Sequence, residues 1–490
     1  MIIKRRDFIR YSGTMGAVAM GSGFARAASG FDYDVVIIGA GMAGMTAGRL
    51  LGRAGPGLKV LILEARDRVG GRMYTAPDRF HELSPHGIEL GAQFIHGSKA
   101  ATWELIKEFG LFTRSTKDFG EPEYRHFQPG QAAYQPDWQT IEQLTQRLRT
   151  AWDAYRGPDI SYQAFVETLG LPIVQQEMLY GEAASWSGGP SRLSVKAVLL
   201  DGAQWDAYWD EDFQISGGYS RLAERLARGL AGQIQLSSKV TGVFWRHGLV
   251  GVTYDYRGTR TGLTTRRLIS TLPIGVMQSG QVSIEPELPE WKQRAIDALE
   301  MGQVVVVQMQ FSDPFLRQNL PVPGGFSTPD GDIYFGLPHP ANPAGQAVTG
   351  WFSGSAAQQI SDLGEEAGLK QILNWLGAAA NLGKLQRKLK WYRYKDWITD
   401  PYSLGSYSIT RPGGHGARET LSKPLQDTVF FAGEATAPPP HYQTVHGAYM
   451  SGQRVALEVS ESLHADPDAQ LTEDRPVILD ADDAPIIELL

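Results

Sequence analysis

The chain has 490 residues, of which 42% are hydrophobic and 20% charged, a composition typical of a globular protein long enough for two intertwined domains. It contains no cysteine, which excludes disulfides, thiolate metal sites and a thioether-linked cofactor, and we expect no metal centre. The formal net charge of −7 argues against a nucleic-acid partner, because phosphate binding requires a basic surface.

The N-terminal residues carry the features of an export signal. Two adjacent arginines, Arg5 and Arg6, precede a weakly apolar run, and the sequence Ala-Arg-Ala at 25–27 offers a cleavage site. The run is too short and too rich in Gly, Ser and Thr to span about 30 Å of hydrocarbon. We therefore predict a twin-arginine signal peptide over residues 1–27, a periplasmic product and no stable membrane insertion.

Residues 33–64 have the pattern of a nucleotide-binding unit, with an apolar strand, a glycine-rich turn, a helix and a second apolar strand. Gly39, Gly41 and Gly44 form the spacing G-x-G-x-x-G, which lets backbone N–H groups and a helix N-terminus approach a pyrophosphate. Glu64 ends the second strand, where a carboxylate can accept both ribose hydroxyls. The pattern predicts a Rossmann-like dinucleotide site and by itself leaves NAD and FAD open.

The continuation EARDRVGGR, which contains Arg66 and Arg72, resembles the second glycine-arginine signature of the FAD-dependent amine oxidase family. A further glycine turn beside an arginine can hold a pyrophosphate from its other side. Four more blocks are similar to the same family, in particular to its polyamine oxidases and flavin-dependent histone demethylases. These blocks are IELGAQFIHGS (88–98), FQISGGYSRLAERLA (213–227) with LSSKVTGV (236–243), DWITDPYSLGSYS (396–408) and FFAGEATAPPPHYQTVHGAYMSGQRVA (430–456).

The resemblance implies a bacterial, exported flavin monoamine oxidase or polyamine oxidase-like enzyme. Its fold would be α/β, with a Rossmann-like FAD-binding domain interleaved with an α+β substrate-binding domain. We expect the FAD-binding domain at 31–100, 213–275 and 425–465, the substrate-binding domain at 101–212 and 276–424, and an acidic C-terminal extension at 466–490.

The resemblance also implies that FAD is bound non-covalently. In the last block a strand leads into a helix whose N-terminus would point at the isoalloxazine, and Glu434 matches the carboxylate near the FAD sugar and phosphates. The residues expected to contact FAD are Gly39, Gly41, Met42, Ala43, Gly44, Glu64, Ala65, Arg66, Gly70, Gly71, Arg72, Gly91, Ala92, Gln93, Phe94, Val240, Gly433, Glu434, Thr444 and Val445.

In this family a neutral amine passes a hydride from its α-carbon to flavin N5, and the resulting imine is hydrolysed to an aldehyde or ketone. Aromatic walls suit this reaction, because they exclude water and disfavour the ammonium form. Tyr407 and Trp397 match the family's aromatic positions, His96 matches its active-site histidine, and Thr444 falls at the opposite wall of its aromatic cage. Each of them is also compatible with an ordinary structural role.

Val306, in the run EMGQVVVVQMQF, falls at the position of the family lysine that assists reoxidation by oxygen, and no residue of this run is basic. Either the run is an ordinary buried strand, or the electrons pass to a periplasmic carrier such as a cytochrome instead of oxygen. Tyr442 is a second candidate for the cage, whereas His446 is expected to be structural.

The substrate class is left open among polyamines, monoamines and alkaloid-type amines, because no acidic cluster in the sequence singles out a polycation. An L-amino-acid oxidase is an alternative, with Arg192 or Arg393 binding the substrate carboxylate. A second alternative is a non-catalytic exported protein that keeps FAD structurally. A homodimer is left open as well.

Overall fold

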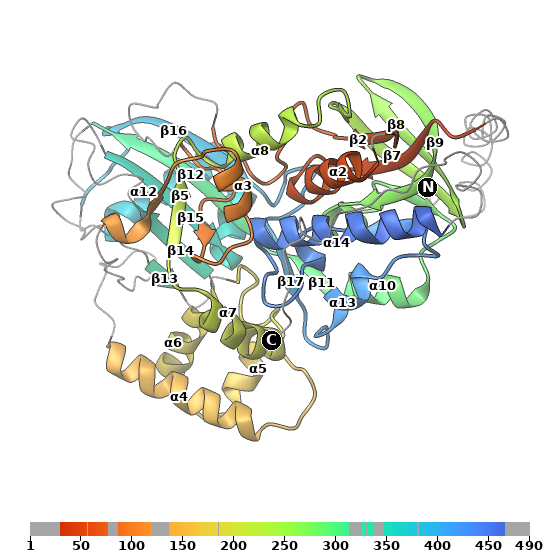
Figure 1. Cartoon of the computed structure of the whole chain (residues 1–490). Helices are drawn as coiled ribbons and strands as arrows, with labels where there is room; N and C mark the ends of the chain where they lie inside the picture. Colours follow the sequence, from red (N-terminus) through yellow and green to blue (C-terminus); the bar gives the residue numbers. More distant parts are fainter. Residues whose placement is uncertain are drawn as a thin grey trace, which may run out of the picture.

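A computed structural model describes the greater part of the chain. The described residues are 30–55, 57–76, 87–119, 137–184, 186–312, 326–328, 331–336, 346–379 and 382–465. The expected signal peptide (1–27) and the acidic extension (466–490) lie outside the described residues. Figure 1 shows one sheet at the upper right, a second sheet at the left and a group of helices below them.

The larger sheet has eight strands. They are β1 (Tyr33–Ile38), β2 (Val60–Leu63), β6 (Ile234–Gln235), β7 (Ser238–Arg246), β8 (Leu249–Tyr256), β9 (Thr259–Ser270), β10 (Ser283–Glu285) and β18 (Val429–Phe431). Their order is β10-β7-β8-β9-β1-β2-β6, with β18 paired to the end of β9. β1 runs parallel to both its neighbours, and parallel strands are covered on both faces, so its sequence YDVVII is almost continuously apolar.

Two helices, α2 (Met42–Ala54) and α14 (Val445–His464), lie side by side against this sheet (Figure 1). They approach closely, because a Cβ added to Gly452 would lie only 2.5 Å from the carbonyl oxygen of Ala43. Two shorter helices, α3 (Trp103–Glu108) and α8 (Tyr219–Arg228), contribute to the same core. The residues of β1 alternate between this core and the core on the opposite face of the sheet.

The second sheet is antiparallel and has the order β13-β14-β15-β12-β16. Its strands are β12 (Val304–Phe311), β13 (Phe326–Thr328), β14 (Gly331–Gly336), β15 (Gln346–Ser353) and β16 (Leu389–Asp396), and α12 (Gly354–Ala379) packs on one face. Val305 and Val307 of β12 pack towards α12, whereas Val304 and Val306 pack on the opposite face with Trp397. The valine-rich run is therefore buried on both sides.

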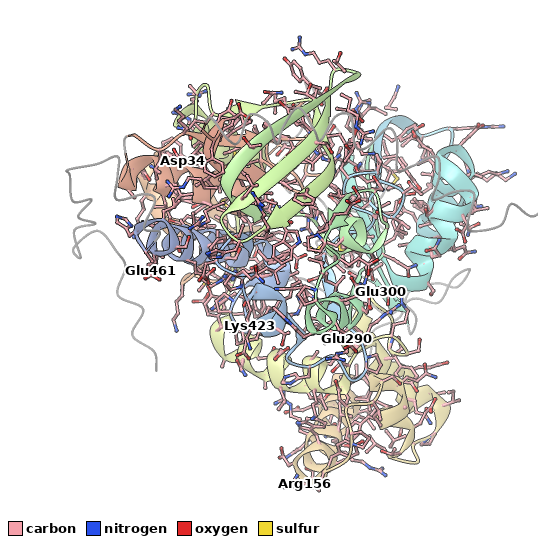
Figure 2. All side chains as sticks on the ribbon, turned by 90° about the vertical axis from the view of Figure 1, so that its right-hand side faces the viewer. Asp34, Arg156, Glu290, Glu300, Lys423 and Glu461 are labelled. Carbon is pink, nitrogen blue, oxygen red and sulfur yellow. The ribbon has the colours of Figure 1, made fainter. Side chains whose placement is uncertain are left out.

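The helices below the sheets are α4 (Trp138–Ala154), α5 (Tyr162–Glu167), α6 (Ile173–Ala184), the π-helix η3 (Ala197–Asp201) and α7 (Gly202–Tyr208). The N-cap of α4 is Asp137, whose side chain accepts a hydrogen bond from the Thr140 N–H. Leu148, Phe165 and Leu179 share one core. In the view turned by 90°, Arg156 next to α4 and Asp34 in β1 lie at opposite ends of the molecule (Figure 2).

The remaining elements are short and connect these parts. They are β3 (Ile95–His96), β4 (Thr113–Ser115), β5 (Asp212–Ile215), β11 (Leu299–Met301), β17 (Ser408–Thr410), α9 (Ile274–Gln278), α10 (Glu290–Asp297), α13 (Ala417–Ser422), η2 (Thr116–Phe119) and η4 (Glu434–Thr436). β3, β5 and β4 pair into a small three-stranded sheet in the order β3-β5-β4. Within the described part of the chain, none of the helices combines the length and the apolar content needed to cross a membrane.

Candidate active site

A cavity of about 1230 Å³ lies where the two sheets and the helical group meet. The five residues expected to take part in catalysis all line it, as do all the residues expected to contact FAD except Gly44. A Cβ added to Gly44 would lie 2.0 Å from the carbonyl oxygen of Gly39. Gly44 therefore serves the close packing of α2 under the turn, and it does not line the cavity.

The glycine turn after β1 is shaped for close approach of a ligand to the backbone. Gly39 has a φ of +102°, and a side chain there would collide with Thr271 Oγ1, 2.5 Å from an added Cβ. Gly41 faces open space, with no atom within 4 Å of an added Cβ. Gly41 is also the N-cap of α2 and supplies no side-chain cap, so the first N–H groups of the helix are available to a phosphate.

Glu64 lies in the cavity wall at the end of β2. Its Oε2 accepts a hydrogen bond of 2.8 Å from the Ala40 N–H, and its Oε1 accepts one of 2.8 Å from the Arg66 N–H. Burial raises the pKa of Glu64, and the two N–H groups offset part of this effect. The side chain is thus held where a ribose would meet it, which fits the adenosine end of FAD.

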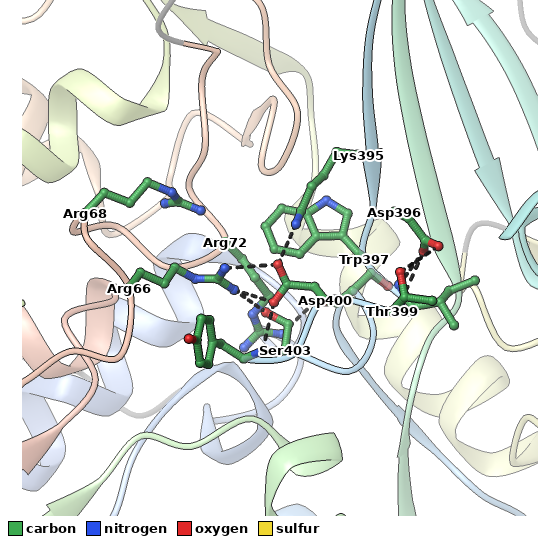
Figure 3. Close-up of polar contacts among 12 residues, drawn as sticks. Arg66, Arg68, Arg72, Lys395, Asp396, Trp397, Thr399, Asp400 and Ser403 are labelled. Carbon is green, nitrogen blue, oxygen red and sulfur yellow. Dashed lines mark hydrogen bonds and ion pairs between the residues drawn. The ribbon is translucent and has the colours of Figure 1, made fainter. Parts of the chain in front are cut away.

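Arg66 is held by a buried carboxylate (Figure 3). Its two Nη atoms donate hydrogen bonds of 3.0 and 2.6 Å to the two oxygens of Asp400, and Lys395 Nζ binds the same carboxylate. Burial alone would raise the pKa of Asp400, but the hydrogen bonds from Arg66 and Lys395 lower it to about 2. The Arg66 guanidinium therefore has a fixed position in the cavity wall.

Arg72 is held in the same way at the other side of the glycine turns. Its Nη1 donates to Glu434 Oε1 at 2.9 Å and to the Ser406 carbonyl at 2.7 Å. Glu434 also accepts hydrogen bonds from the N–H and hydroxyl of Ser408. Burial would raise the pKa of Glu434, but the charges of Arg72 and Arg418 lower it, so the carboxylate is ionised.

The aromatic walls come from the loop after β16. Trp397 is buried and donates its Nε1–H to the Leu90 carbonyl at 2.7 Å. The Tyr407 hydroxyl forms a hydrogen bond with Ser187 Oγ. The Thr444 hydroxyl caps α14, because it accepts the Gly447 N–H at 2.9 Å and donates to the His441 carbonyl. The two aromatic side chains thus have fixed orientations beside the cavity.

Two aromatic residues join this part of the lining. Tyr442, the second candidate for the cage, lines the cavity, with the Arg418 guanidinium carbon 4.5 Å from its ring centre. Trp351 of β15 also lines it, although no sequence motif indicates this residue. It stands opposite Val306 in the sheet register, which only strand pairing reveals.

The structure places a lysine beside Val306. Val306 stands opposite Lys395 of β16, and residues paired across strands project from the same face of a sheet. The Lys395 ammonium binds Asp400 and lies 4.6 Å from the ring centre of Trp397. The run around Val306 contains no basic residue, but Lys395 reaches the same sheet face from another strand, without lining the cavity.

The outer part of the cavity is lined by the helical group. Thr145, Leu148, Arg149, Trp152 and Asp153 project from one side of α4, as their spacing of three and four residues requires. Trp186 and Trp205 line the same part of the cavity.

Acidic residues also line this outer part, namely Asp153, Asp206 and Asp212. The substrate class, which the sequence leaves open because no acidic cluster in it singles out a polycation, stays open. Asp206 and Asp212 are close in sequence, whereas Asp153 comes from the distant helix α4, and the fold brings all three to one cavity. Arg149 partly balances them, since its Nη2 lies 3.5 Å from Asp206 Oδ2.

His446 and the two candidate arginines have structural surroundings. His446 is buried against His441, with 3.1 Å between Nε2 and Nδ1, and burial lowers its pKa to about 2. Neither Arg192 nor Arg393 lines the cavity, and Arg192 binds Glu300. An arginine for a substrate carboxylate is therefore not found among these candidates.

The chain is similar in sequence to known flavin-dependent proteins. Residues 42–460 match the family described as flavin containing amine oxidoreductase, and the chain belongs to this family. It is 28% identical over 470 residues to the human protein lysine-specific histone demethylase 2, covering 87% of this chain and 53% of that protein. It is also 28% identical over 461 residues to polyamine oxidase 4 of Oryza sativa subsp. japonica, covering 87% and 88%. The chain thus spans about half the length of the demethylase but most of the oxidase.

A solved structure has the same fold. A triple mutant of putrescine oxidase superposes with a TM-score of 0.73 and 22% identity, covering 88% of this chain and 99% of the other. The predicted fold class, in which a Rossmann-like FAD-binding domain is combined with a substrate-binding domain, is confirmed. FAD is therefore the cofactor of the chain. The open glycine turn at Gly41 and the held carboxylate of Glu64 fit this cofactor.

Proposed function

We propose that the protein oxidises a small-molecule amine at the carbon next to nitrogen. The observation that carries this proposal is that Tyr407 and Trp397 line the same cavity as the glycine turn and Glu64. FAD bound in the cavity would supply the two-electron acceptor for the α-hydrogen of the amine, which leaves as hydride. The imine left behind is hydrolysed by water to a carbonyl compound.

The protein's own residues would bind the amine and exclude water. The walls formed by Trp397 and Tyr407 disfavour a charged ammonium, because a charge loses hydration in an apolar site. The neutral amine is the form that can release hydride. The aromatic residues of the outer cavity, Trp152, Trp186 and Trp205, favour a substrate that carries an apolar or aromatic body.

The experiment is anaerobic mixing of the FAD-loaded protein with a panel of amines, followed by loss of the yellow absorbance of oxidised flavin. The panel includes putrescine, spermine, phenylethylamine and a tertiary alkaloid-type amine, and an L-amino acid series serves as the comparison. We expect bleaching by amines and not by amino acids. If no amine bleached the flavin, a non-catalytic FAD protein would be the better description.

The electron acceptor is proposed to be oxygen or a carrier such as a cytochrome, in a periplasmic location set by the export signal. Val306 favours the carrier, because Lys395, the cation on the same sheet face, binds Asp400 and does not line the cavity. Admitting air to the substrate-reduced protein distinguishes the two possible electron acceptors. Reoxidation within seconds would support oxygen, and reoxidation only after a cytochrome is added would support the carrier.

A further inference from the structure

A short segment of the helical group, residues 186–189, reaches the start of the second sheet. Trp186 lines the outer part of the cavity, whereas the next residue, Ser187, is fully buried and does not line it. The Ser187 carbonyl accepts the Gln303 N–H at 3.0 Å, directly before the first residue of β12. Ser187 therefore joins the helical group to the second sheet.

Ser187 has a backbone conformation that is unusual for serine. Its φ is +61°, in the left-handed region, which a residue with a Cβ adopts only when the surrounding structure holds it there. Close packing against Gly302 contributes to this constraint, because a Cβ added to Gly302 would lie 2.9 Å from the Cβ of Ser187. Non-glycine residues in this region cluster at functional sites, which directs attention to what the Ser187 side chain contacts.

The Ser187 side chain contacts Tyr407. Its Oγ forms a hydrogen bond with the Tyr407 hydroxyl. At the other end of Tyr407, the backbone carbonyl accepts the Gly302 N–H at 2.7 Å. The ring is therefore held at both ends, and Ser187 holds the end that is far from the backbone. Tyr407 lines the cavity, so Ser187 acts on the site only through this ring.

We propose that Ser187 is a positioning residue that orients the Tyr407 ring for amine oxidation. The inference rests on the proposed function and assigns a role to a residue that does not itself line the cavity. A Tyr407 ring that can tilt still excludes water and contacts the amine, but it no longer holds the reacting carbon in one place. Loss of the Ser187 hydroxyl should therefore lower the rate of flavin reduction more than the affinity for the amine.

Two variants separate the hydroxyl of Ser187 from its backbone. Ser187→Ala removes the hydroxyl and keeps a Cβ, whereas Ser187→Gly removes the hydroxyl and suits a positive φ. With the amine that bleaches the flavin fastest, both should lower the limiting rate of anaerobic flavin reduction about fivefold, the effect of one neutral hydrogen bond. The dissociation constant of the amine should change by less than about twofold.

The stability of the same two variants gives a second readout. Ser187→Gly should unfold at a higher urea concentration than Ser187→Ala, because alanine retains the unfavourable φ. Equal rates with different stabilities would support a role of the hydroxyl in the reaction. Rates that follow the stabilities would mean that the backbone conformation sets the rate, and would contradict the proposal.

The double variant Ser187→Ala/Tyr407→Phe tests whether the two residues act together. Because each single change breaks the same hydrogen bond, the double variant should reduce its flavin no more slowly than either single variant. Slowing by the product of the two single effects would show that Ser187 acts independently of Tyr407, and would overturn the proposal. A wild-type rate in Ser187→Ala would overturn it as well.

The matched control is Ser462→Ala, which also removes a buried serine hydroxyl. Ser462 Oγ accepts the Arg267 Nε–H at 2.9 Å, and Ser462 does not line the cavity. This variant should be less stable to urea and keep the wild-type rate of flavin reduction. A merely structural Ser187 would give the same result as this control.

A measurement without substrate distinguishes failure of this proposal from failure of the proposed function. The visible circular dichroism of bound, oxidised FAD depends on the protein groups around it. It should change in the same way in Ser187→Ala and Tyr407→Phe, and not in Ser462→Ala. If these changes appear but no amine bleaches the wild-type flavin, the proposed function fails and the positioning of Tyr407 by Ser187 stands. If amines bleach the flavin but Ser187→Ala leaves both the rate and the dichroism unchanged, the proposed function stands and the positioning role is rejected.

Discussion

The two ends of the cavity are built from different parts of the chain. At the cofactor end the contacts come from backbone groups and glycines in continuous segments, such as the turn at Gly39 and Gly41. At the substrate end they come from side chains on α4 and, about fifty residues further along the chain, on α7 and β5. Ligand contacts that come from backbone groups depend on the exact conformation of the backbone. An end made of side chains can change its ligand by single substitutions that leave the fold intact.

The largest effect is expected from a pair of glycine substitutions at the cofactor end. Gly44→Ala would place a methyl group 2.0 Å from the Gly39 carbonyl oxygen and should cost about 3 kcal/mol or more of folding free energy. Gly41→Ala makes the same chemical change where no atom lies within 4 Å. It should fold normally and lose FAD affinity. Urea unfolding measures the stability of each variant, and titration with FAD measures its affinity for the cofactor. Equal stability of the two variants would contradict the packing role of Gly44.

A second prediction concerns Glu89, which is buried next to the segment 91–94 in the middle of the cavity wall. Burial raises its pKa to about 8, although Thr75 Oγ1 and the Tyr219 N–H donate to it. Because the folded pKa is the higher one, its stabilisation is full below its unfolded value of about 4.3 and is lost as the pH rises to about 8. The slope should be about 1.4 kcal/mol per pH unit.

Glu89→Gln removes this ionisable group and keeps a side chain of the same size. Its stability should therefore fall less between pH 5 and 8 than that of the wild-type protein, as urea unfolding at several pH values would show. Parallel curves for the two proteins would mean that Glu89 is ionised in the folded state.

A third prediction concerns Asp400, which binds both Arg66 and Lys395. Its folded pKa of about 2 lies below its ordinary value, so its stabilisation is present above about pH 4 and is lost as the pH falls towards 2. The loss should be about 2 kcal/mol. Asp400→Asn should be less stable than wild type at pH 6 by a similar amount, and the difference should disappear near pH 2.

The smallest effect is expected at the substrate end. Tyr407→Phe keeps the aromatic wall but leaves Ser187 Oγ without the hydroxyl that it now contacts, and should cost about 1 kcal/mol of stability. Anaerobic flavin reduction should slow by less than about tenfold, because the wall still excludes water. Tyr407→Ala removes the wall and should slow it more. If both variants slowed flavin reduction equally, the rate would depend on the hydroxyl of Tyr407 and not on its ring.

Much of the cofactor end was predictable from the sequence, and the reason is local. The glycine turn, β1, β2 and Glu64 obey rules that act within about thirty residues, so their order predicts their geometry. Lys395 and Trp351 were not predictable, because only strand register places them beside Val306. Asp212 was missed for the same reason, since its partner His96 is paired to it across two short strands.

The sequence by itself determined the nucleotide-binding unit, the family resemblance and the positions of the aromatic walls. The nucleotide-binding unit depends on apolar periodicity and on glycine spacing, which are properties of neighbouring residues, whereas the aromatic walls follow from the resemblance to the family. Only the tertiary structure decided which side chains meet at the substrate end, where the carboxylate of Asp212 contacts the ring of His96. Such contacts depend on how strands pair and helices pack over long separations, and the free energy of a buried polar group depends on the neighbours that packing supplies.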